Sequence, residues 1–527
     1  MSSSLHVLLL ANIGQGGPYH LIFLSKREKT SLLNQSISSG IGLRREFVDR
    51  NQFKVVIIGA GPGGICAAIK LLEAGIRDFV MLEKAGGVGG TWWHNRYPGA
   101  ECDVPSHLYS FSFEQKRDWS RPYARQPEIL DYMQHVVQKY ELMPHVRLSS
   151  NVEEARWNAG TDTWQLQIEG SSELVEGQFL ISGVGMFTEL TYPDIGGIDD
   201  FQGTKFHTAD WLDGHKLSGE KVAVIGSAAS AVQMIPEIVD EVDQLTVFQR
   251  RAQWVLPKED EAFSEEEIRT FVEDDSVAAK QRASIREGLE NFITFSNKEV
   301  LEKAEVRGLE NIAVVKNPET RQKLTPDMAY GCRRPLSSNL YYPVFNRDHV
   351  TLVTDAIDTL TAKGVSAGGR ETEVDTIIFA TGFQTTRYLS CIDVYGKEGL
   401  SIHDAWKNGA QAYLGITTAG FPNLFMLYGP NTNNGSILEM LEHQVEYSVG
   451  QIRSLEASGH NWLSLKTERM GTYNTSLQKD IEGVDVWQGT CGGYYRGNAG
   501  FIVTQWPHTM DKYKAWLDQD SDSFDYG

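Results

Sequence analysis

The chain has 527 residues, 41% of them hydrophobic and 22% charged, which is the composition of a folded protein of two or three domains. Its formal net charge of −20 argues against nucleic acid or an anionic membrane surface as a partner, because both attract basic proteins. The five cysteines are dispersed without a C-x-x-C pair. We therefore expect no metal site, no dithiol reductase and no disulfide scaffold, and a reducing, cytoplasmic setting.

The first fifty residues contain one apolar run, Leu5–Leu10, which no basic residue precedes. Glycines and Pro18 follow it closely, so the run is shorter than the ~18 apolar residues that a membrane helix needs, and it lacks the basic start of a signal peptide. We expect residues 1–50 to form a weakly ordered extension and the chain to have no stable membrane insertion. The oligomeric state is left open.

A short β-branched run, KVVIIG, ends in Gly59 and leads into the turn GAGPGG, an amphipathic segment and a second apolar run, DFVML. Gly59 would permit the tight turn, Gly61 the approach of a pyrophosphate, and Gly64 the close packing of helix on strand. Glu83 follows Gly64 by about twenty residues, where an acid meets a ribose hydroxyl. This order of strand, turn, helix and acid predicts a dinucleotide site.

The next segment, Gly86–Ser110, is rich in glycine and aromatic residues and contains two adjacent tryptophans, Trp92 and Trp93. A solvated glycine-rich loop is one interpretation. Flat aromatic walls suit an isoalloxazine ring, and a solvated loop has no need of them. A wall beside such a flat ring is the other interpretation.

Three further elements complete the first half of the chain. Apolar residues at helical spacing follow Ile129 and predict a core helix, and Trp157–Ile168 alternates like a half-buried hairpin. Phe179–Gly185, FLISGVG, has the pattern of a buried strand that closes the first nucleotide-binding domain.

A second strand, KVAVIG, ends in Gly226 and leads into GSAASA, where Ala228 replaces the middle glycine of the fingerprint. The next strand, LTVFQR, ends in two arginines rather than in an acid. Because an arginine binds a ribose 2′-phosphate bidentately, the expected cofactor is NADPH; a solvated basic strand end is the alternative. The candidate contacts are Gly226, Ser227, Ser230, Arg250 and Arg251. Beyond them, residues 258–330 are highly charged with apolar residues at helical intervals, which predicts a helical insertion capping the second domain.

Between the two turns lies FQGTKFHTADW, Phe201–Trp211, with the spacing F-x-G-x-x-x-H-x-x-x-W. On this signature, and on matches from about Lys54 to about Tyr513, the chain resembles the Baeyer–Villiger monooxygenases, flavoenzymes that oxidise ketones with NADPH and O2. The resemblance implies an α/β fold with two Rossmann-like dinucleotide-binding domains, one for FAD and one for NADP. Residues 51–196 and 386–527 would form the FAD-binding domain, 197–257 and 331–385 the NADP-binding domain, and 258–330 a helical insertion in the latter.

The segment GGTWWHNRYPGAECDV resembles the family's G-G-T-W-Y-W-N-R-Y-P-G-A-R-C-D-V. One departure is Glu101, which stands where the family commonly has arginine and places a negative charge near the nicotinamide cofactor. The residues expected to border FAD are Thr91, Trp92, Asp103, Val104, Tyr109 and Val152.

The segment YGCRRPLSSNLYYPVFNR resembles the family's G-C-K-R-P-L…Y-Y…F-N-R, which implies that Arg334 is the active-site arginine, paired with Asp103. Arg333 would add a contact to the NADPH phosphate. His207, the histidine of the signature, is expected to support domain movement from a linker; general base is the alternative. Near the C-terminus, Tyr494 takes the place of a tryptophan that covers cofactor and substrate.

The resemblance implies a reaction in which NADPH reduces FAD and reduced FAD forms a flavin peroxide with O2. Held as an anion by Arg334, the peroxide would add to a ketone and give an ester or lactone. Two alternatives remain: an N- or S-hydroxylating flavin monooxygenase, and a flavin-dependent NADPH oxidoreductase without oxygenation. G-C-R-R and G-P-N-T are similar to fungal enzymes of secondary metabolite biosynthesis that oxidise bulky ketones.

Overall fold

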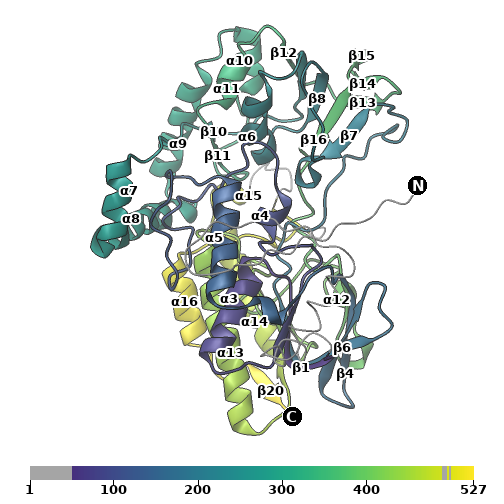
Figure 1. The fold of residues 1–527 in the computed structure, drawn as a ribbon, viewed down its shortest axis with the longest axis vertical. Helices are drawn as coiled ribbons and strands as arrows, with labels where there is room; N and C mark the ends of the chain where they lie inside the picture. Colours follow the sequence, from purple (N-terminus) through teal and green to yellow (C-terminus); the bar gives the residue numbers. More distant parts are fainter. Residues whose placement is uncertain (1–49, 489–494, 498–499) are drawn as a thin grey trace, which may run out of the picture. The chain divides into compact units, whose positions relative to one another are not determined.

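The computed structural model describes residues 50–488, 495–497 and 500–527, and its elements are arranged around two sheets (Figure 1). The first sheet has eight strands in the order β17-β4-β5-β6-β1-β2-β3, with β18 paired to β6. Its strands are β1 (Gln52–Ile58), β2 (Phe79–Leu82), β3 (Val146–Arg147), β4 (Val152–Asn158), β5 (Thr163–Ile168), β6 (Leu174–Ser182), β17 (Asp393–Tyr395) and β18 (Leu424–Met426).

The first sheet is parallel at its centre, because β1 pairs in parallel with both β2 and β6. The buried run of β1 leads into helix α3 (Pro62–Glu73), which packs on α13 (Ile437–Ser458). The predicted hairpin is present as the antiparallel pair of β4 and β5. Further helices of this half are α4 (Thr91–His94), α5 (Gln126–Lys139), α12 (Ile402–Ala405), α14 (Thr467–Glu482), α15 (Asp485–Gln488) and α16 (Met510–Asp518).

The second sheet has five parallel strands in the order β12-β9-β8-β16-β7. They are β7 (Thr204–His207), β8 (Lys221–Ile225), β9 (Gln244–Phe248), β12 (Val350–Val353) and β16 (Thr376–Phe379), with α6 (Ala229–Ile238) after β8 and α11 (Tyr341–Val344) before β12. Each sheet thus contains a strand that leads through a glycine turn into a helix, β1 into α3 and β8 into α6. The α/β class with two Rossmann-like halves, predicted from the sequence, is confirmed.

Three small sheets complete the strands. A hairpin sheet consists of β13 (Ile357–Leu360), β14 (Gly364–Ala367) and β15 (Arg370–Glu373). The short strand β10 (Val255–Leu256) pairs in parallel with β11 (Leu336–Ser337), directly after the arginine pair of the G-C-R-R segment. Near the C-terminus, β19 (Leu463–Leu465) pairs with β20 (Phe524–Tyr526).

The helical insertion consists of α7 (Glu265–Glu273), α8 (Asp275–Ile293), α9 (Lys298–Ile312) and α10 (Pro318–Leu324), and it contacts both halves rather than the second alone. Helix α9 packs on β10, and Asn311 donates to the carbonyls of Val255 and Ser338 at 3.0 Å. Helix α8, in contrast, is fixed to the first half. Arg282 donates to backbone carbonyls of the segment 107–110, and Arg286 pairs with Glu439 of α13 at 2.8 Å.

Two chain segments that connect the sheets pair with each other. Thr191 donates its N–H to the carbonyl of Gly382 at 2.8 Å, and Gln384 donates to Glu189 at 3.0 Å. Both segments continue into the cavity described below. Within the described part of the chain, no helix is long and apolar enough to cross a bilayer. The cysteines depart in one respect from the expected reduced set, because Cys332 is disulfide-bonded, whereas Cys66, Cys102 and Cys391 are free.

Candidate active site

A cavity of about 460 Å³ collects residues from both glycine turns and from both connecting segments. The predicted site residues that line it are Gly59, Gly61, Glu83, Thr91, Trp92, Asp103, Val104, Tyr109, Val152, Ser230, Arg333 and Arg334. Gly64, Gly226, Ser227, His207, Arg250 and Arg251 do not line it, and Tyr494 lies outside the described residues. The structure therefore brings most of the expected contacts around one volume.

The first glycine turn leaves little space at its three fingerprint glycines. Gly59 has φ of +97°, a left-handed conformation that favours glycine, and a Cβ on Gly64 would lie 1.9 Å from the Gly59 carbonyl oxygen. The Cα of Gly90 would lie 3.3 Å from a Cβ on Gly61. Gly59 and Gly61 face the cavity at the start of α3, so their backbone is open to a pyrophosphate beside the helix N-terminus. The turn fits the phosphates of a dinucleotide.

Glu83 stands at the carboxyl end of β2 with 4% of its surface exposed. Its carboxylate accepts the backbone N–H of Ala60 at 2.7 Å and that of Ala85 at 2.8 Å. Both oxygens thus brace the turn. Because a carboxylate oxygen has more than one lone pair, Glu83 retains acceptor capacity for a ribose hydroxyl on the cavity side.

The second turn is built with less glycine. Gly226 has φ of +119°, and a Cβ there would lie 2.3 Å from the carbonyl oxygen of Ala380. Ala228, the N-cap of α6, and Ser230 line the cavity, whereas Ser227 donates to the Arg251 carbonyl at 3.2 Å. Arg250 and Arg251 are exposed just after β9. The arginines thus follow β9, the strand after α6, and do not line the cavity.

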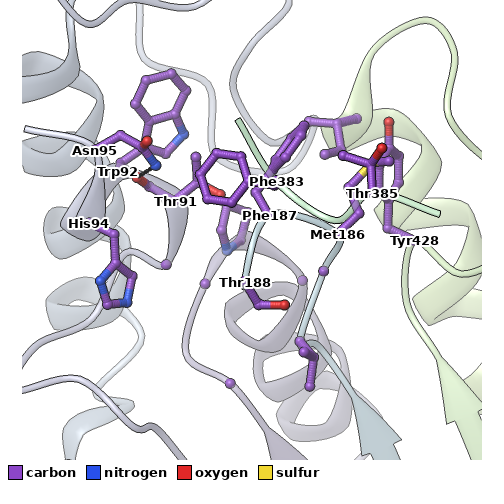
Figure 2. A pocket seen from close by; sticks show the side chains of 18 of the residues that line it. Thr91, Trp92, His94, Asn95, Met186, Phe187, Thr188, Phe383, Thr385 and Tyr428 are labelled. Carbon is purple, nitrogen blue, oxygen red and sulfur yellow. Dashed lines mark hydrogen bonds between the residues drawn. The ribbon is translucent and has the colours of Figure 1, made fainter. Parts of the chain in front are cut away.

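Aromatic side chains form the walls of the cavity (Figure 2). Trp92 donates from its indole N–H to the Tyr109 hydroxyl at 3.0 Å, and the two rings meet edge to face. In Figure 2 the rings of Phe187 and Phe383 lie between the Thr91–Asn95 segment and Tyr428; their centroids are 5.3 Å apart. These flat, largely apolar surfaces suit an isoalloxazine ring and an apolar substrate.

An ion pair between Arg334 and Asp103 lies at the cavity wall. Both Nε and Nη2 of Arg334 donate to Oδ2 of Asp103, at 2.9 and 2.6 Å. The two residues are 231 positions apart and come from different halves of the chain. These two charge-assisted hydrogen bonds fix the plane of the guanidinium group. The Arg334 side chain nevertheless remains 46% exposed.

His207 is fully buried at the end of β7, outside the cavity. Its Nδ1 accepts the N–H of Ala209 at 3.0 Å. Burial lowers its pKa to about 4, while the nearby backbone of Gly382 and the charge of Asp210 oppose the shift. His207 is therefore neutral near pH 7, and its surroundings include Phe383, whose ring borders the cavity.

Glu101 also lines the cavity, and its charge has a partner. Lys258 places Nζ 2.6 Å from Glu101 Oε1, and the two side chains are only 5% and 13% exposed. Burial raises the pKa of the Glu101 carboxyl, and the Lys258 charge lowers it. The sequence indicated the acidic residue but not the lysine that neutralises it.

Several lining residues were not predicted, among them Met186, Phe187, Phe383 and Tyr428. The Tyr428 hydroxyl donates to Asn433 Oδ1 at 2.6 Å, and Asn433 Nδ2 donates to Gln505 at 2.7 Å. A usable signal existed for some of them, because Met186 and Phe187 directly follow a predicted buried strand. In an open parallel sheet, ligands bind beyond the carboxyl ends of the strands.

The described residues hold no group of three or more His, Cys, Asp or Glu side chains placed to bind a metal ion. Two glycine turns that open on one cavity, with an arginine–aspartate pair in its wall, are the arrangement expected of a pyridine-nucleotide oxidoreductase. Residues 56–287 match the family model of the pyridine nucleotide-disulphide oxidoreductases.

Sequence relatives and solved structures identify the family within this class of oxidoreductases. The chain is 38% identical to a Baeyer–Villiger monooxygenase of Pseudomonas aeruginosa, over 88% of this chain and 89% of the relative, and 37% identical to the FAD-binding monooxygenase ktnD of Aspergillus niger, over 89% and 81%. Among solved structures, cyclohexanone monooxygenase from Rhodococcus sp. Phi1 bound to NADP+ matches with a TM-score of 0.81 and 30% identity, over 91% of this chain and 99% of that one. A complex of OTEMO with FAD and NADP matches with 0.81 and 26%, over 90% and 99%. The chain belongs to the Baeyer–Villiger monooxygenase family, as its motifs predicted.

Proposed function

We propose that the chain uses FAD, NADPH and O2 to insert one oxygen atom beside a ketone carbonyl, giving an ester or a lactone. Its family consists of flavin-dependent monooxygenases that use NADP. The observation that carries the proposal is the Asp103–Arg334 pair in the wall of a cavity that both glycine turns share. FAD, when bound, would supply the redox chemistry by taking a hydride from NADPH and activating O2.

The two sheets support the proposed domain division. We assign residues 51–196 and 386–527 to the FAD-binding domain, because β1–β6, β17 and β18 share one sheet. Residues 197–257 and 331–385 form the NADP-binding domain around β7–β9, β12 and β16. Residues 258–330 are the insertion, whose α8 is fixed to the FAD side and whose α9 is fixed to the NADP side.

The first turn would hold FAD. The backbone of Gly59 and Gly61 binds the pyrophosphate, while Gly64 keeps α3 close to its strand. Glu83 accepts a ribose hydroxyl. The residues that face the flavin ring are Thr91, Trp92, Asp103, Val104, Tyr109 and Val152.

The second turn would hold NADPH. Gly226, Ser227 and Ser230 belong to the turn that faces the pyrophosphate, and Arg250 and Arg251 are placed to bind the 2′-phosphate after β9. Arg333 lines the cavity and adds a further positive charge. NADPH rather than NADH follows from the two arginines, because an acid at this position would repel the phosphate.

Arg334 is the residue proposed to act on the reacting atoms. A guanidinium is always charged in proteins, so it stabilises negative charge that develops on oxygen at the reaction centre. Asp103 holds the guanidinium in one orientation through Oδ2. His207 does not reach the cavity and is proposed as a positioning residue that fixes the segment near Gly382 and Phe383.

The test is incubation of the FAD-loaded protein with NADPH, ¹⁸O2 and a panel of ketones, with mass spectrometry of the products. One ¹⁸O in an ester is the expected result. A thioether tests the heteroatom alternative, and hydrogen peroxide without oxygenated product would support the oxidoreductase alternative. Arg334→Ala should retain FAD and oxidise NADPH while ester formation falls by about 10²–10³-fold. Ester formation by Arg334→Ala at the wild-type rate would show that this role is wrong.

A further inference from the structure

The ion pair of Glu101 and Lys258 is unusual because a carboxylate stands in a cavity wall that is expected to receive an anionic nucleotide. Its partner comes from a segment 157 positions later in the sequence. The Nζ–Oε1 distance of 2.6 Å and the low exposure of both side chains make it a close and largely desolvated pair. Removing two charges from water costs free energy, so stability alone does not explain the pair.

Glu101 lies on the nicotinamide-nucleotide side of the cavity. Gln233 Nε2 donates to the Glu101 carbonyl at 3.1 Å, and Gln233 is one helical turn inside α6. The N-terminal residues of the same helix, Ala228 to Ser230, line the cavity together with Glu101 and Gln233. A bare carboxylate at this place would repel the phosphates of a dinucleotide bound at the turn.

Lys258 is held in place from several sides. Its backbone N–H donates to Asn339 Oδ1 at 2.8 Å, and the Asn339 amide donates back to the Lys258 carbonyl. The ammonium lies 4.3 Å from the centre of the Tyr123 ring, within the range of a cation–π contact. Asp260, two residues on, pairs with Arg121 at 3.2 Å instead of with Lys258. The lysine is therefore a fixed counter-ion for Glu101.

We propose that Lys258 is a positioning residue for NADPH: it neutralises Glu101, so that the wall beside the second turn carries no net negative charge toward the nucleotide. The inference rests on the proposed function, in which this turn binds NADPH. It makes residue 258, which lies outside both glycine turns, a determinant of nucleotide affinity.

The experiment measures the dissociation constant of NADP+ for the FAD-loaded protein from the change in flavin absorbance on titration. Lys258→Met leaves Glu101 without its partner and should raise the dissociation constant by about tenfold or more. Glu101→Gln combined with Lys258→Met removes both charges and should return it to within about threefold of wild type. If Lys258 acts by neutralising Glu101, the second substitution restores the affinity for NADP+. If Lys258 only holds the local structure together, the double variant binds NADP+ as weakly as Lys258→Met.

Two further variants complete the test. The reversed pair, Glu101→Lys with Lys258→Glu, keeps an ion pair and should bind NADP+ at least as tightly as wild type, which also decides the question if Lys258→Met does not fold. Arg347→Met, the control, breaks an exposed ion pair with Asp240 outside the cavity and should leave the constant unchanged. The inference is wrong if Lys258→Met binds like wild type, if the double variant binds as weakly as Lys258→Met, or if the reversed pair is tenfold weaker. Wild type that binds FAD but no NADP+ would contradict the proposed function as well.

Discussion

The two glycine turns follow the same plan but tolerate different residues. In both, the first glycine has a left-handed backbone and no space for a Cβ, at Gly59 and at Gly226. At the last position, Gly64 could not carry a methyl group, whereas the second turn has Ala231, which is fully buried. The first position of such a turn is therefore fixed by backbone geometry, and the others depend on how closely helix and strand pack.

The strongest way to break this comparison is Gly64→Ala. Its Cβ would lie 1.9 Å from the carbonyl oxygen of Gly59, so α3 must move away from β1 and the phosphate turn must open. We expect FAD affinity to fall by about tenfold or more, measured as the flavin-to-protein absorbance ratio after purification and dialysis. Gly450→Ala, in α13, is the control, because a Cβ there meets no atom within 4 Å. Full flavin content in Gly64→Ala would contradict this packing argument.

The second sheet can be tested separately through pH, because His207 is buried at the end of β7 with a pKa of about 4. The unfolded chain binds a proton on this histidine near pH 6.5, whereas the folded chain does not. The free energy of unfolding is therefore highest above that pH and decreases as the pH falls toward 4. This loss amounts to about 3 kcal/mol for a shift of this size. His207→Asn keeps an acceptor for the N–H of Ala209. It should reduce the pH dependence of the free energy of unfolding between pH 6.5 and pH 4, measured by denaturant titrations. An unchanged slope would argue against a neutral buried histidine.

The arginines after β9 sharpen the comparison, since the first half has Glu83 at the corresponding strand end. Arg250→Ala with Arg251→Ala should raise KM for NADPH by about tenfold and leave KM for NADH nearly unchanged. Steady-state kinetics with both nucleotides measure this. Arg370→Ala, on the exposed strand β15, is the matched control. An equal rise for both nucleotides would show that the arginines do not read the 2′-phosphate.

The smallest effect is expected from Ala228→Gly, which gives the second turn the middle glycine of the first. Removal of one methyl group from the cavity wall lets the backbone approach the pyrophosphate more closely, so we expect NADP+ to bind about threefold more tightly. Titration of the FAD-loaded protein with NADP+ measures this. Weaker binding would indicate that the Ala228 methyl group contacts the nucleotide favourably.

The sequence was informative where the structure is local. A strand, a glycine turn and a helix occupy consecutive residues, so β1 with α3 and β8 with α6 could be predicted from pattern alone. The motif resemblance likewise indicated that Asp103 pairs with Arg334, and the structure has that ion pair.

The remaining walls could not be predicted in this way, because they depend on how distant segments meet. Phe187 and Phe383 face each other only because the two connecting segments pair. The same applies to Lys258, whose relation to Glu101 no local pattern reveals. The insertion was expected to cap the second domain, and the contacts of α8 with the first half were missed because single arginines on a charged helix are usually solvated.

Those contacts carry a consequence for how this enzyme can diverge. One guanidinium nitrogen of Arg282 donates to the carbonyls of His107, Leu108 and Ser110, which flank Tyr109 in the sequence. Tyr109 in turn accepts the indole hydrogen of Trp92 in the cavity wall. Helix α8, which has no recognised motif, is thereby connected through Arg282 and Tyr109 to the aromatic lining of the cavity. Substitutions in α8 would therefore alter the positions of aromatic side chains in the cavity wall without changing any residue of the two glycine turns.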